Sequence, residues 1–322
     1  MLTPDVAGML VAVLVPELAS SAAVREWYNA RRHTRLCQES GLAGWTTAHC
    51  FLAEMGGIRL VNDNCRWTGG EGRCPREVQT NIGQISRLHK NGLLSREVVN
   101  LSAEDIADRS KADGLVKAIA IVQTLWFAAQ CIGRAAQGLH LTALEIVTPG
   151  FVLCALVNYT MWYYKPLDVS HGVVASYSCT LPDGSHAPAL NMGNTRDGFL
   201  ADPDPLRPGG MALLVLLVVF GAVHCAAWNA DFPTPSEGLL WRIAAAMTTG
   251  IPLLLFTFLH FEGRTPAGSK RTTIFDLVIY GTMVSYVLAR GCLVVEMFAS
   301  LRAQPLECYQ SVEWIKFLPH FG

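Results

Sequence analysis

The sequence predicts an all-α fold, a polytopic transmembrane helical bundle of about six spans with a helical cytosolic segment. Five apolar stretches are long enough for a transmembrane helix, which needs about 20 residues. Only 16% of the 322 residues are charged, whereas soluble domains have about 25%, and the mean hydropathy is positive at +0.29. Nearly every apolar stretch also contains a charged or strongly polar residue well inside it, which favours a bundle with a polar interior.

The first apolar run, within residues 1–24, predicts a short or kinked membrane helix. Its uninterrupted part, Val6–Val15, is shorter than a full span, and Pro16 and Glu17 follow directly. A cleaved signal peptide is the weaker interpretation, because the run has neither a basic region before it nor a clear cleavage site.

Residues 25–113 are polar and predict a cytosolic, mostly helical segment. Within it, Ser102 followed by Glu104 and Asp105 is typical of a helix start, where the helix dipole favours carboxylates. The cytosolic loop over 165–209 is rich in Pro, Gly and Asp, so we expect no long regular element there. This loop either caps the bundle or simply connects its helices.

Five longer apolar runs predict the remaining membrane helices, two within 114–164 and three within 210–301, ahead of a C-terminal tail over 302–322. Pro235, Ser236 and Glu237 stand before one of these runs and mark a helix start. The expected spans are 118–135, 141–163, 210–228, 239–259 and 274–301.

The distribution of basic residues predicts the orientation of the bundle. Lysine and arginine residues occur in the 25–113, 164–209 and 260–273 segments, whereas the connections 136–140 and 229–238 contain none. Under the positive-inside rule the first three segments are cytosolic, and the C-terminus is lumenal or external. The expected location is an integral, multi-pass position in the endoplasmic reticulum membrane.

Charge and motifs exclude several classes of function. The formal net charge is -1 and the basic residues are dispersed, so nucleic acid is not an expected partner. The ten cysteines show no CxxC and the histidines no HExxH, so no metal site is predicted. No GxGxxG, P-loop or GxSxG motif occurs, and no cofactor is predicted. Cys65 and Cys74 flank a Gly-rich turn, but a disulfide between them is disfavoured on the cytosolic side.

Charged residues inside the predicted membrane helices are the candidate catalytic residues. A charge at the centre of such a helix costs about 2.5 to 3.5 kcal/mol, so these side chains turn toward protein or a wet cavity. The structural alternative is hydrogen bonding between helices, and Arg134, near a helix end, can also reach the interface. We expect Arg134 to pair with Glu145 or Glu296, and Arg290 to pair with the other acid. The candidates are Glu145, Glu296, Arg134, Arg290 and His224.

Aromatic and amide side chains are the candidate substrate-binding residues. One helix face collects polar and aromatic residues at helical spacing, and we do not expect it to face lipid. This stripe consists of Gln123, Trp126, Gln130, Arg134 and Gln137. The candidates for substrate binding are Trp126, Gln130, Tyr159, Trp162 and Trp228. Lys165, Asp168 and His171 follow an aromatic helix end and could reach a pocket mouth, although Lys165 is also a typical interface anchor.

Several stretches of the chain carry a family resemblance. They are VPELASSAAVREWYNAR, GWTTAHCFLAEMGGI, ARGCLVVEMFASLR, VFGAVHCAAWNADFPTPSEGLLWR and the long block from IADRSKADG to YYKPLDV. In these stretches the chain resembles a widespread, mostly uncharacterised family of multi-pass integral membrane proteins of filamentous fungi. The resemblance implies a fungal, helical, polytopic protein whose relatives have further sequence before the VPEL helix, and it implies no common activity. The residues that coincide with the family pattern and could line a site are Trp126, Gln130, Arg134, Glu145, Lys165, Asp168, His224, Trp228, Arg290 and Glu296.

Aromatic walls combined with a few polar groups are the usual composition of a small-molecule site. They predict a membrane-embedded enzyme of fungal secondary metabolism that acts on a lipophilic, terpenoid or polyketide-like substrate. The expected reaction is a cofactor-free cyclisation or isomerisation, with a pericyclic reaction as one form. Expected partners are the lipid bilayer, the lipophilic substrate and other membrane-bound biosynthetic enzymes. The alternative is a non-enzymatic transporter or scaffold protein, although the lack of internal duplication argues mildly against a secondary transporter.

Overall fold

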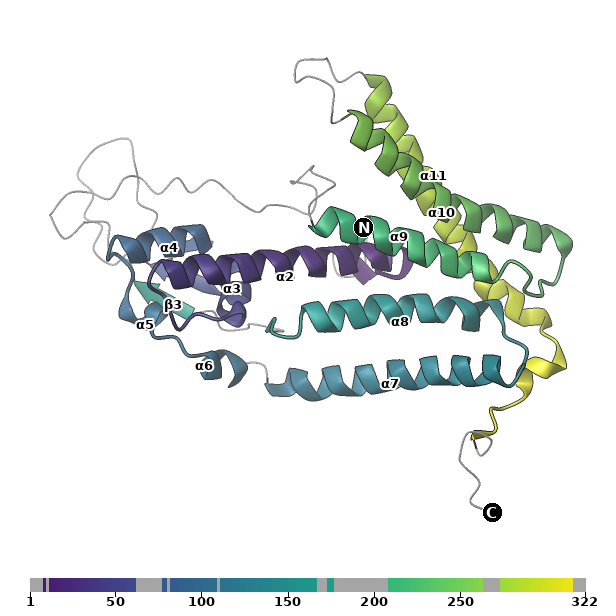
Figure 1. Ribbon diagram of the computed structural model, residues 1–322, viewed down its shortest axis with the longest axis horizontal. Coiled ribbons are helices and arrows are strands. Elements are labelled where there is room, and N and C mark those ends of the chain that lie inside the picture. The colour runs from purple at the N-terminus through teal and green to yellow at the C-terminus, as the bar shows by residue number, and fades with distance from the viewer. Residues whose placement is uncertain are drawn as a thin grey trace. The chain divides into compact units, whose positions relative to one another are not determined.

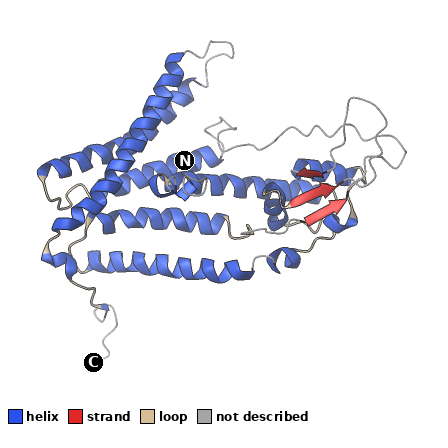
Figure 2. Ribbon diagram, turned by 180° about the vertical axis from the view of Figure 1, so that it is seen from behind, coloured by secondary structure: helices blue, strands red, loops and turns tan. Residues whose placement is uncertain are grey.

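The structure is a computed structural model, and within the residues it describes the chain is mostly helical, as predicted (Figures 1 and 2). The chain divides into two compact units. The first comprises Met1–Val24, Ile119–Thr160 and Asp204–Gly322, and the second comprises Arg25–Ala118 and Met161–Pro203. The structure describes residues 8–9, 12–61, 77–79, 82–108, 111–166, 173–176, 208–262 and 273–314. Cys65, Cys74, Asp168 and His171 therefore lie outside the described residues.

Among the described residues, five helices are long and apolar enough to cross a membrane, which fits a multi-pass membrane protein. Their bounds lie within a few residues of the five longer predicted spans, so each of these predicted spans is a helix in the structure. The predicted N-terminal span lies partly outside the described residues, and α2 (Pro16–Glu39) begins where its apolar run ends. The five helices are α7 (Lys111–Ala136), α8 (Ala143–Met161), α9 (Pro208–Ala226), α10 (Pro235–Glu262) and α11 (Thr273–Ala299).

Small residues bring the helices of the first unit close together. α10 packs against both α9 and α11. A Cβ added to Gly221 of α9 would lie 2.5 Å from Oγ1 of Thr249 in α10, so only glycine permits this approach. Trp241, Ala244 and Ala245 of α10 are buried in the core of this unit. This packing fixes the face of α9 that carries the candidate residue His224.

The second unit combines short helices with a small sheet that the all-α prediction did not include (Figure 2). The strand order is β2-β1-β3, with β1 antiparallel to β2 and parallel to β3. Because β1 precedes α7 and α8 in the sequence and β3 follows them, the sheet joins segments from both sides of these two helices in the chain. The elements are α3 (Thr47–Glu54), β1 (Ile58–Val61), β2 (Glu77–Gln79), α4 (Ile82–Lys90), α5 (Arg96–Val99), α6 (Ala103–Asp108) and β3 (Val173–Ser176).

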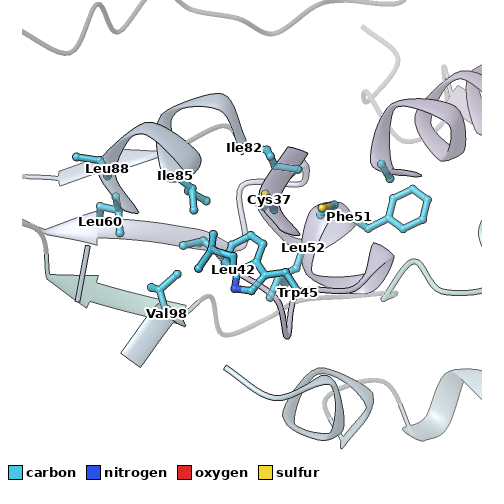
Figure 3. Close-up of a cluster of buried hydrophobic side chains, with 14 of the residues drawn as sticks. Cys37, Leu42, Trp45, Phe51, Leu52, Leu60, Ile82, Ile85, Leu88 and Val98 are labelled. Carbon is cyan, nitrogen blue, oxygen red and sulfur yellow. The ribbon is translucent and has the colours of Figure 1, made fainter. Parts of the chain in front are cut away.

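Buried aromatic and aliphatic side chains form the core of the second unit (Figure 3). Trp45 and Phe51 are each 1% exposed, and they pack with side chains of β1 and α4 such as Leu60 and Ile85. Burial of such large apolar side chains contributes about 1.5 to 3 kcal/mol each. The second unit therefore has a hydrophobic core of its own.

Helix α3 shows why the second unit folds as it does locally. Its end is a Schellman motif: the Gly57 N–H donates to Leu52 O at 2.8 Å, the Gly56 N–H donates to Ala53 O at 3.0 Å, and Gly56 has φ +77°. At its start, Nδ1 of His49 accepts the Thr46 N–H at 3.1 Å, and Nε2 lies 2.9 Å from Leu101 O. Nε2 therefore carries the proton, and burial lowers the pKa of His49.

Two predicted helix starts are confirmed. The Asp105 N–H donates to Ser102 Oγ at 3.0 Å, and the Ser102 N–H donates to the Asp105 carboxylate at 3.3 Å at the start of α6. At the start of α10, the Glu237 N–H donates to Thr234 Oγ1 at 3.3 Å. Both are side-chain caps that satisfy N–H groups left free at a helix terminus.

Candidate functional site

Glu17 is a buried carboxylate in the first turn of α2, within the first unit. Pro16 suits the first helical position because an N–H there would have no helical partner, and the helix dipole favours a carboxylate in this turn. Glu17 is 0% exposed, and Ser20, which follows it in the same turn, donates to Cys154 O of α8 at 3.1 Å. The beginning of α2 is thereby held against α8.

Arg290 of α11 lies fully buried beside Glu17. Its Nε donates to Leu14 O at 2.8 Å, and its Nη2 is 3.8 Å from Oε1 of Glu17. Its Nη1 lies 3.0 Å from Nε2 of His224 in α9. The guanidinium also lies over the Phe220 ring at 4.3 Å from the ring centroid, a cation–π contact. Arg290 therefore connects α11 to α9 and to the start of α2.

The surroundings of His224 fix its protonation state. A guanidinium has only donors, so Nε2 of His224 must accept from Arg290 and carries no proton. The other ring nitrogen, Nδ1, lies 2.7 Å from Phe220 O and donates to it. The imidazole is therefore neutral. Trp241 Nε1 also donates to the His224 carbonyl oxygen at 3.2 Å and holds the C-terminal end of α9.

Two polar atoms at this point are left without a hydrogen bond. Tyr286 OH donates to Oε1 of Glu17 at 3.5 Å. In the part of the chain that the structure describes, Oε2 of Glu17 and Nη2 of Arg290 are buried and have no hydrogen-bond partner. Each such group costs about 1 to 3 kcal/mol, and more when charged. We call Glu17, His224, Tyr286 and Arg290 the Glu17–Arg290 centre.

The pairing expected for the two arginines is confirmed for Arg134 and wrong for Arg290. Nε of Arg134 lies 3.2 Å from Oε1 of Glu145, as expected. The acid beside Arg290 is Glu17 rather than Glu296. Glu296 lies six residues after Arg290 on α11, about 120° around a helix of 3.6 residues per turn, so the two side chains point in different directions.

Arg134 holds the C-terminal segment, residues 304–314. Its Nη1 donates to Gln310 O at 2.5 Å, and its Nη2 donates to Cys308 O at 2.9 Å and to His140 O at 2.7 Å. Gln137 exchanges two hydrogen bonds with the Glu313 backbone, at 2.9 and 3.1 Å. Farther along α7, Trp126 stacks on Trp314 with 5.2 Å between ring centroids. Three members of the predicted polar stripe thus contact this segment.

Glu145 has a capping role at the start of α8. Its Oε2 accepts the Thr142 N–H at 2.9 Å and the Thr142 hydroxyl at 3.1 Å, while its own N–H donates to Thr142 Oγ1 at 3.2 Å. This reciprocal pattern is a capping box. Together with the Arg134 ion pair, it gives the Glu145 carboxylate partners on both oxygens.

The structure does not bring all the candidate catalytic residues together. His224 and Arg290 meet in the Glu17–Arg290 centre, whereas Arg134 and Glu145 form a separate pair. Glu296 is 7% exposed, and its Oε2 has no hydrogen bond within the described ranges.

The aromatic candidates are also spread over the two units. Trp126 and Trp228 are 57% and 42% exposed, and Tyr159 and Gln130 are half-buried. In the second unit, Trp162 Nε1 donates to Oε2 of Glu26 at 2.9 Å, and Nζ of Lys165 lies 2.7 Å from the same oxygen. Such a cluster of aromatic, basic and acidic side chains is typical of a membrane interface.

Glu17 and Tyr286 were not among the site residues predicted from the sequence. The signal for Glu17 was present, because a carboxylate interrupts an apolar run that otherwise reads as membrane helix. Tyr286 gave no comparable signal, since tyrosine is common in such helices. Among the described residues, no group of three or more His, Cys, Asp or Glu side chains could hold a metal ion.

The comparisons with known proteins give a family and no activity. No curated protein and no solved structure matches the chain. The model of a family of unknown function, DUF8562, matches residues 5–180 and 211–321. These two ranges cover most of the chain, which therefore belongs to the family of unknown function DUF8562.

Proposed function

We propose that this protein is a membrane-embedded enzyme that isomerises or cyclises a lipophilic metabolite without a cofactor, with the Glu17–Arg290 centre as its active site. The observation that carries the proposal is that two buried atoms, Oε2 of Glu17 and Nη2 of Arg290, have no hydrogen bond among the residues that the structure describes. Burying an ionisable side chain within a membrane has a high free-energy cost, and such residues are usually functional. A buried ion pair in which two atoms make no hydrogen bond is therefore more typical of a functional site than of helix packing. A terpenoid or polyketide-like substrate, a fungal source and the endoplasmic reticulum belong to the same proposal.

The residues of the centre suit a proton shift next to a carbonyl group. The Arg290 Nη2 donor would hold the carbonyl oxygen of the substrate, and Oε2 of Glu17 would take a proton from the adjacent carbon. The C–H bond breaks, and its electron pair moves into an enolate whose oxygen charge Arg290 stabilises. Return of the same proton to the far end of the conjugated system forms a new C–H bond, so the reaction is an isomerisation that needs no oxidant or reductant.

The other members of the centre position Glu17 and Arg290. His224 accepts from Nη1 and Leu14 O accepts from Nε, and Nη2 is the guanidinium nitrogen that has no hydrogen bond within the described residues. Tyr286 donates to Oε1 of Glu17 and leaves Oε2 as the free oxygen. Arg134, Glu145 and Glu296 have no role in this chemistry.

The test is conversion of lipophilic enones by microsomes that contain the protein, followed by product analysis. Glu17→Gln keeps the size of the side chain but cannot accept the proton, so we expect turnover to fall by about 10²- to 10⁴-fold. Glu296→Gln is the matched control, because it neutralises another buried carboxylate of the same unit, and we expect turnover close to that of the wild type. Equal turnover in wild type and Glu17→Gln would exclude the proposed active site. Accumulation of unchanged substrate inside vesicles would favour transport.

A further inference from the structure

Oε2 of Glu17 and Nη2 of Arg290, which make no hydrogen bond among the described residues, are called the idle atoms of the Glu17–Arg290 centre. They determine which hydrogen bonds a ligand can form here. Arg290 uses Nε on Leu14 O and Nη1 on His224, which leaves Nη2 as a donor. Glu17 accepts Tyr286 OH on Oε1, which leaves Oε2 as an acceptor. A complementary ligand must therefore offer one acceptor to Arg290 and one donor to Glu17.

The charge of the centre restricts the ligand further. The Glu17 carboxylate and the Arg290 guanidinium cancel, and His224 is neutral because its Nε2 accepts from Arg290. Glu17, Arg290 and His224 are at most 2% exposed. A carboxylate, phosphate or ammonium group placed here would remain an uncompensated buried charge, which is strongly unfavourable. The group that fits is neutral.

The geometry requires the donor and the acceptor to lie close together on the ligand. Nη2 of Arg290 is 3.8 Å from Oε1 of Glu17, and Oε2 is bonded to the same carboxyl carbon as Oε1. The two idle atoms can therefore be bridged by one small functional group. Phe220 and Trp241 lie beside His224, with ring centroids 5.0 and 6.0 Å from the imidazole, so the immediate neighbours are aromatic.

We infer, resting on the proposed function, that the Glu17–Arg290 centre recognises a neutral hydroxy-carbonyl group, as in an enolised 1,3-dicarbonyl or an acyl phenol, on an apolar body. The ligand hydroxyl donates to Oε2 of Glu17, and the neighbouring carbonyl oxygen accepts from Nη2 of Arg290. A hydroxyl can also come from water, which offers a donor and an acceptor but no apolar body. A lipophilic ligand would be displaced from the centre by a lipophilic competitor, whereas bound water would give no saturable binding of a lipophilic probe.

The test is photo-labelling in native microsomes with a radiolabelled, photoreactive acyl phenol that carries an isoprenoid chain. Unlabelled acyl phenol should abolish saturable labelling. The O-methyl ether lacks the donor and should compete about 10- to 100-fold more weakly, as should the analogue in which a carboxylate replaces the hydroxy-carbonyl group. These arms use the wild-type protein and do not depend on the folding of any variant.

A matched pair of variants tests whether the ligand binds at the Glu17–Arg290 centre. Glu17→Gln should lose most of the preference for the phenol over its methyl ether, whereas Glu296→Gln should retain it. Equal competition by the phenol and its ether would overturn the inference, as would stronger competition by the carboxylate. Absence of saturable labelling would mean that water alone occupies the idle atoms, and would overturn it too.

The ligand class and the proposed function fail in different ways. Selective labelling without any turnover supports the ligand class and contradicts the enzymatic proposal. Turnover that Glu17→Gln removes, together with equal binding of phenol and ether, supports the enzyme and contradicts the ligand class.

Discussion

Two arginines are buried in the described part of the first unit, Arg134 and Arg290, and they use their hydrogen-bond donors differently. Arg134 directs both terminal nitrogens to backbone carbonyls, of His140, Cys308 and Gln310. Arg290 donates to one carbonyl and one imidazole, and its third nitrogen has no hydrogen bond among the described residues. Nε of Arg134 also has no hydrogen bond among the described residues, but it lies 3.2 Å from Oε1 of Glu145, whereas Nη2 of Arg290 is 3.8 Å from Oε1 of Glu17. Under the proposed function, Arg134 holds the C-terminal segment and Arg290 binds the ligand.

Their acidic neighbours show the same contrast. Glu145 completes a capping box with Thr142 and also lies beside Arg134. Glu17 accepts one long hydrogen bond from Tyr286 and keeps its second oxygen free. The two arginines that the sequence ranks together as intramembrane charges therefore differ: Arg134 belongs to a structural pair and Arg290 to a candidate catalytic pair.

The largest stability effect is expected at Arg290. Arg290→Gln leaves the Glu17 carboxylate buried without its counter-charge, which should lower the free energy of unfolding by about 3 to 5 kcal/mol. The double variant Glu17→Gln and Arg290→Gln removes both charges and should regain part of that loss. The measurement is thermal unfolding in detergent, and a double variant less stable than Arg290→Gln would contradict the ion-pair assignment.

A smaller effect, with a different pattern, is expected at Arg134. Arg134→Gln removes charge-assisted hydrogen bonds that are worth about 1.5 to 3 kcal/mol each; because the glutamine amide can still donate to some of the same carbonyls, the net cost should be about the value of one such bond. It should also make the 304–314 segment more sensitive to limited proteolysis while labelling by the acyl phenol persists. Arg302→Gln is the control, because that side chain is 56% exposed and its pair with Glu237 contributes little. Loss of labelling in folded Arg134→Gln would remove the distinction between the two arginines.

The second unit extends the contrast to a fully satisfied histidine. Burial lowers the pKa of His49 below its ordinary value of about 6.5. Between the folded and ordinary values the unfolded state binds more protons, so the stability of this unit should fall as the pH decreases below about 6.5. Hydrogen exchange of the 47–54 peptide should therefore be faster at pH 5.5 than at pH 7.5, after correction for intrinsic rates. His49→Gln should show less of this pH dependence, and an identical dependence in the variant would assign it to another group.

The smallest effect is expected at the aromatic end of the C-terminal segment. Trp314→Leu removes the stack on Trp126 but no hydrogen bond of Arg134, so it should cost only about 0.5 to 1.5 kcal/mol. Thermal unfolding beside Arg134→Gln provides the measurement. A larger loss in Trp314→Leu than in Arg134→Gln would mean that the aromatic contact, rather than the arginine, holds the segment.

The long helices of this fold and two of its helix starts were predictable from the sequence. The length of the apolar runs identified the five long helices, and the helix starts near Ser102 and Pro235 followed from helix-start signals in the sequence. The pairing of Arg134 with Glu145 was also predictable as one of two alternatives, because only a short connection separates α7 from α8. The sheet was not predictable, since its strands have three or four residues and β1 pairs with β3 across more than a hundred residues of sequence.

The composition of the candidate site was only partly predictable. His224 and Arg290 were selected because they are ionisable and lie inside apolar runs, but which acid lies beside Arg290 depends on how α2, α9 and α11 pack. Glu17 was interpreted as a break in a helix, and only the packed structure places it against Arg290. Periodicity identifies which residues share a face of one helix, but it does not identify the facing helix.

The most direct test is ligand-induced thermal stabilisation of three proteins: wild type, Arg134→Lys and Arg290→Lys. Both substitutions keep the positive charge and change the donor geometry. At about 100 times its dissociation constant, the acyl phenol should raise the free energy of unfolding of the wild type by about 2.7 kcal/mol. We predict the same ligand-induced increase in Arg134→Lys, from a lower starting stability, and little or none in Arg290→Lys. An undiminished increase in Arg290→Lys, or its loss in Arg134→Lys alone, would contradict the assignment of the Glu17–Arg290 centre.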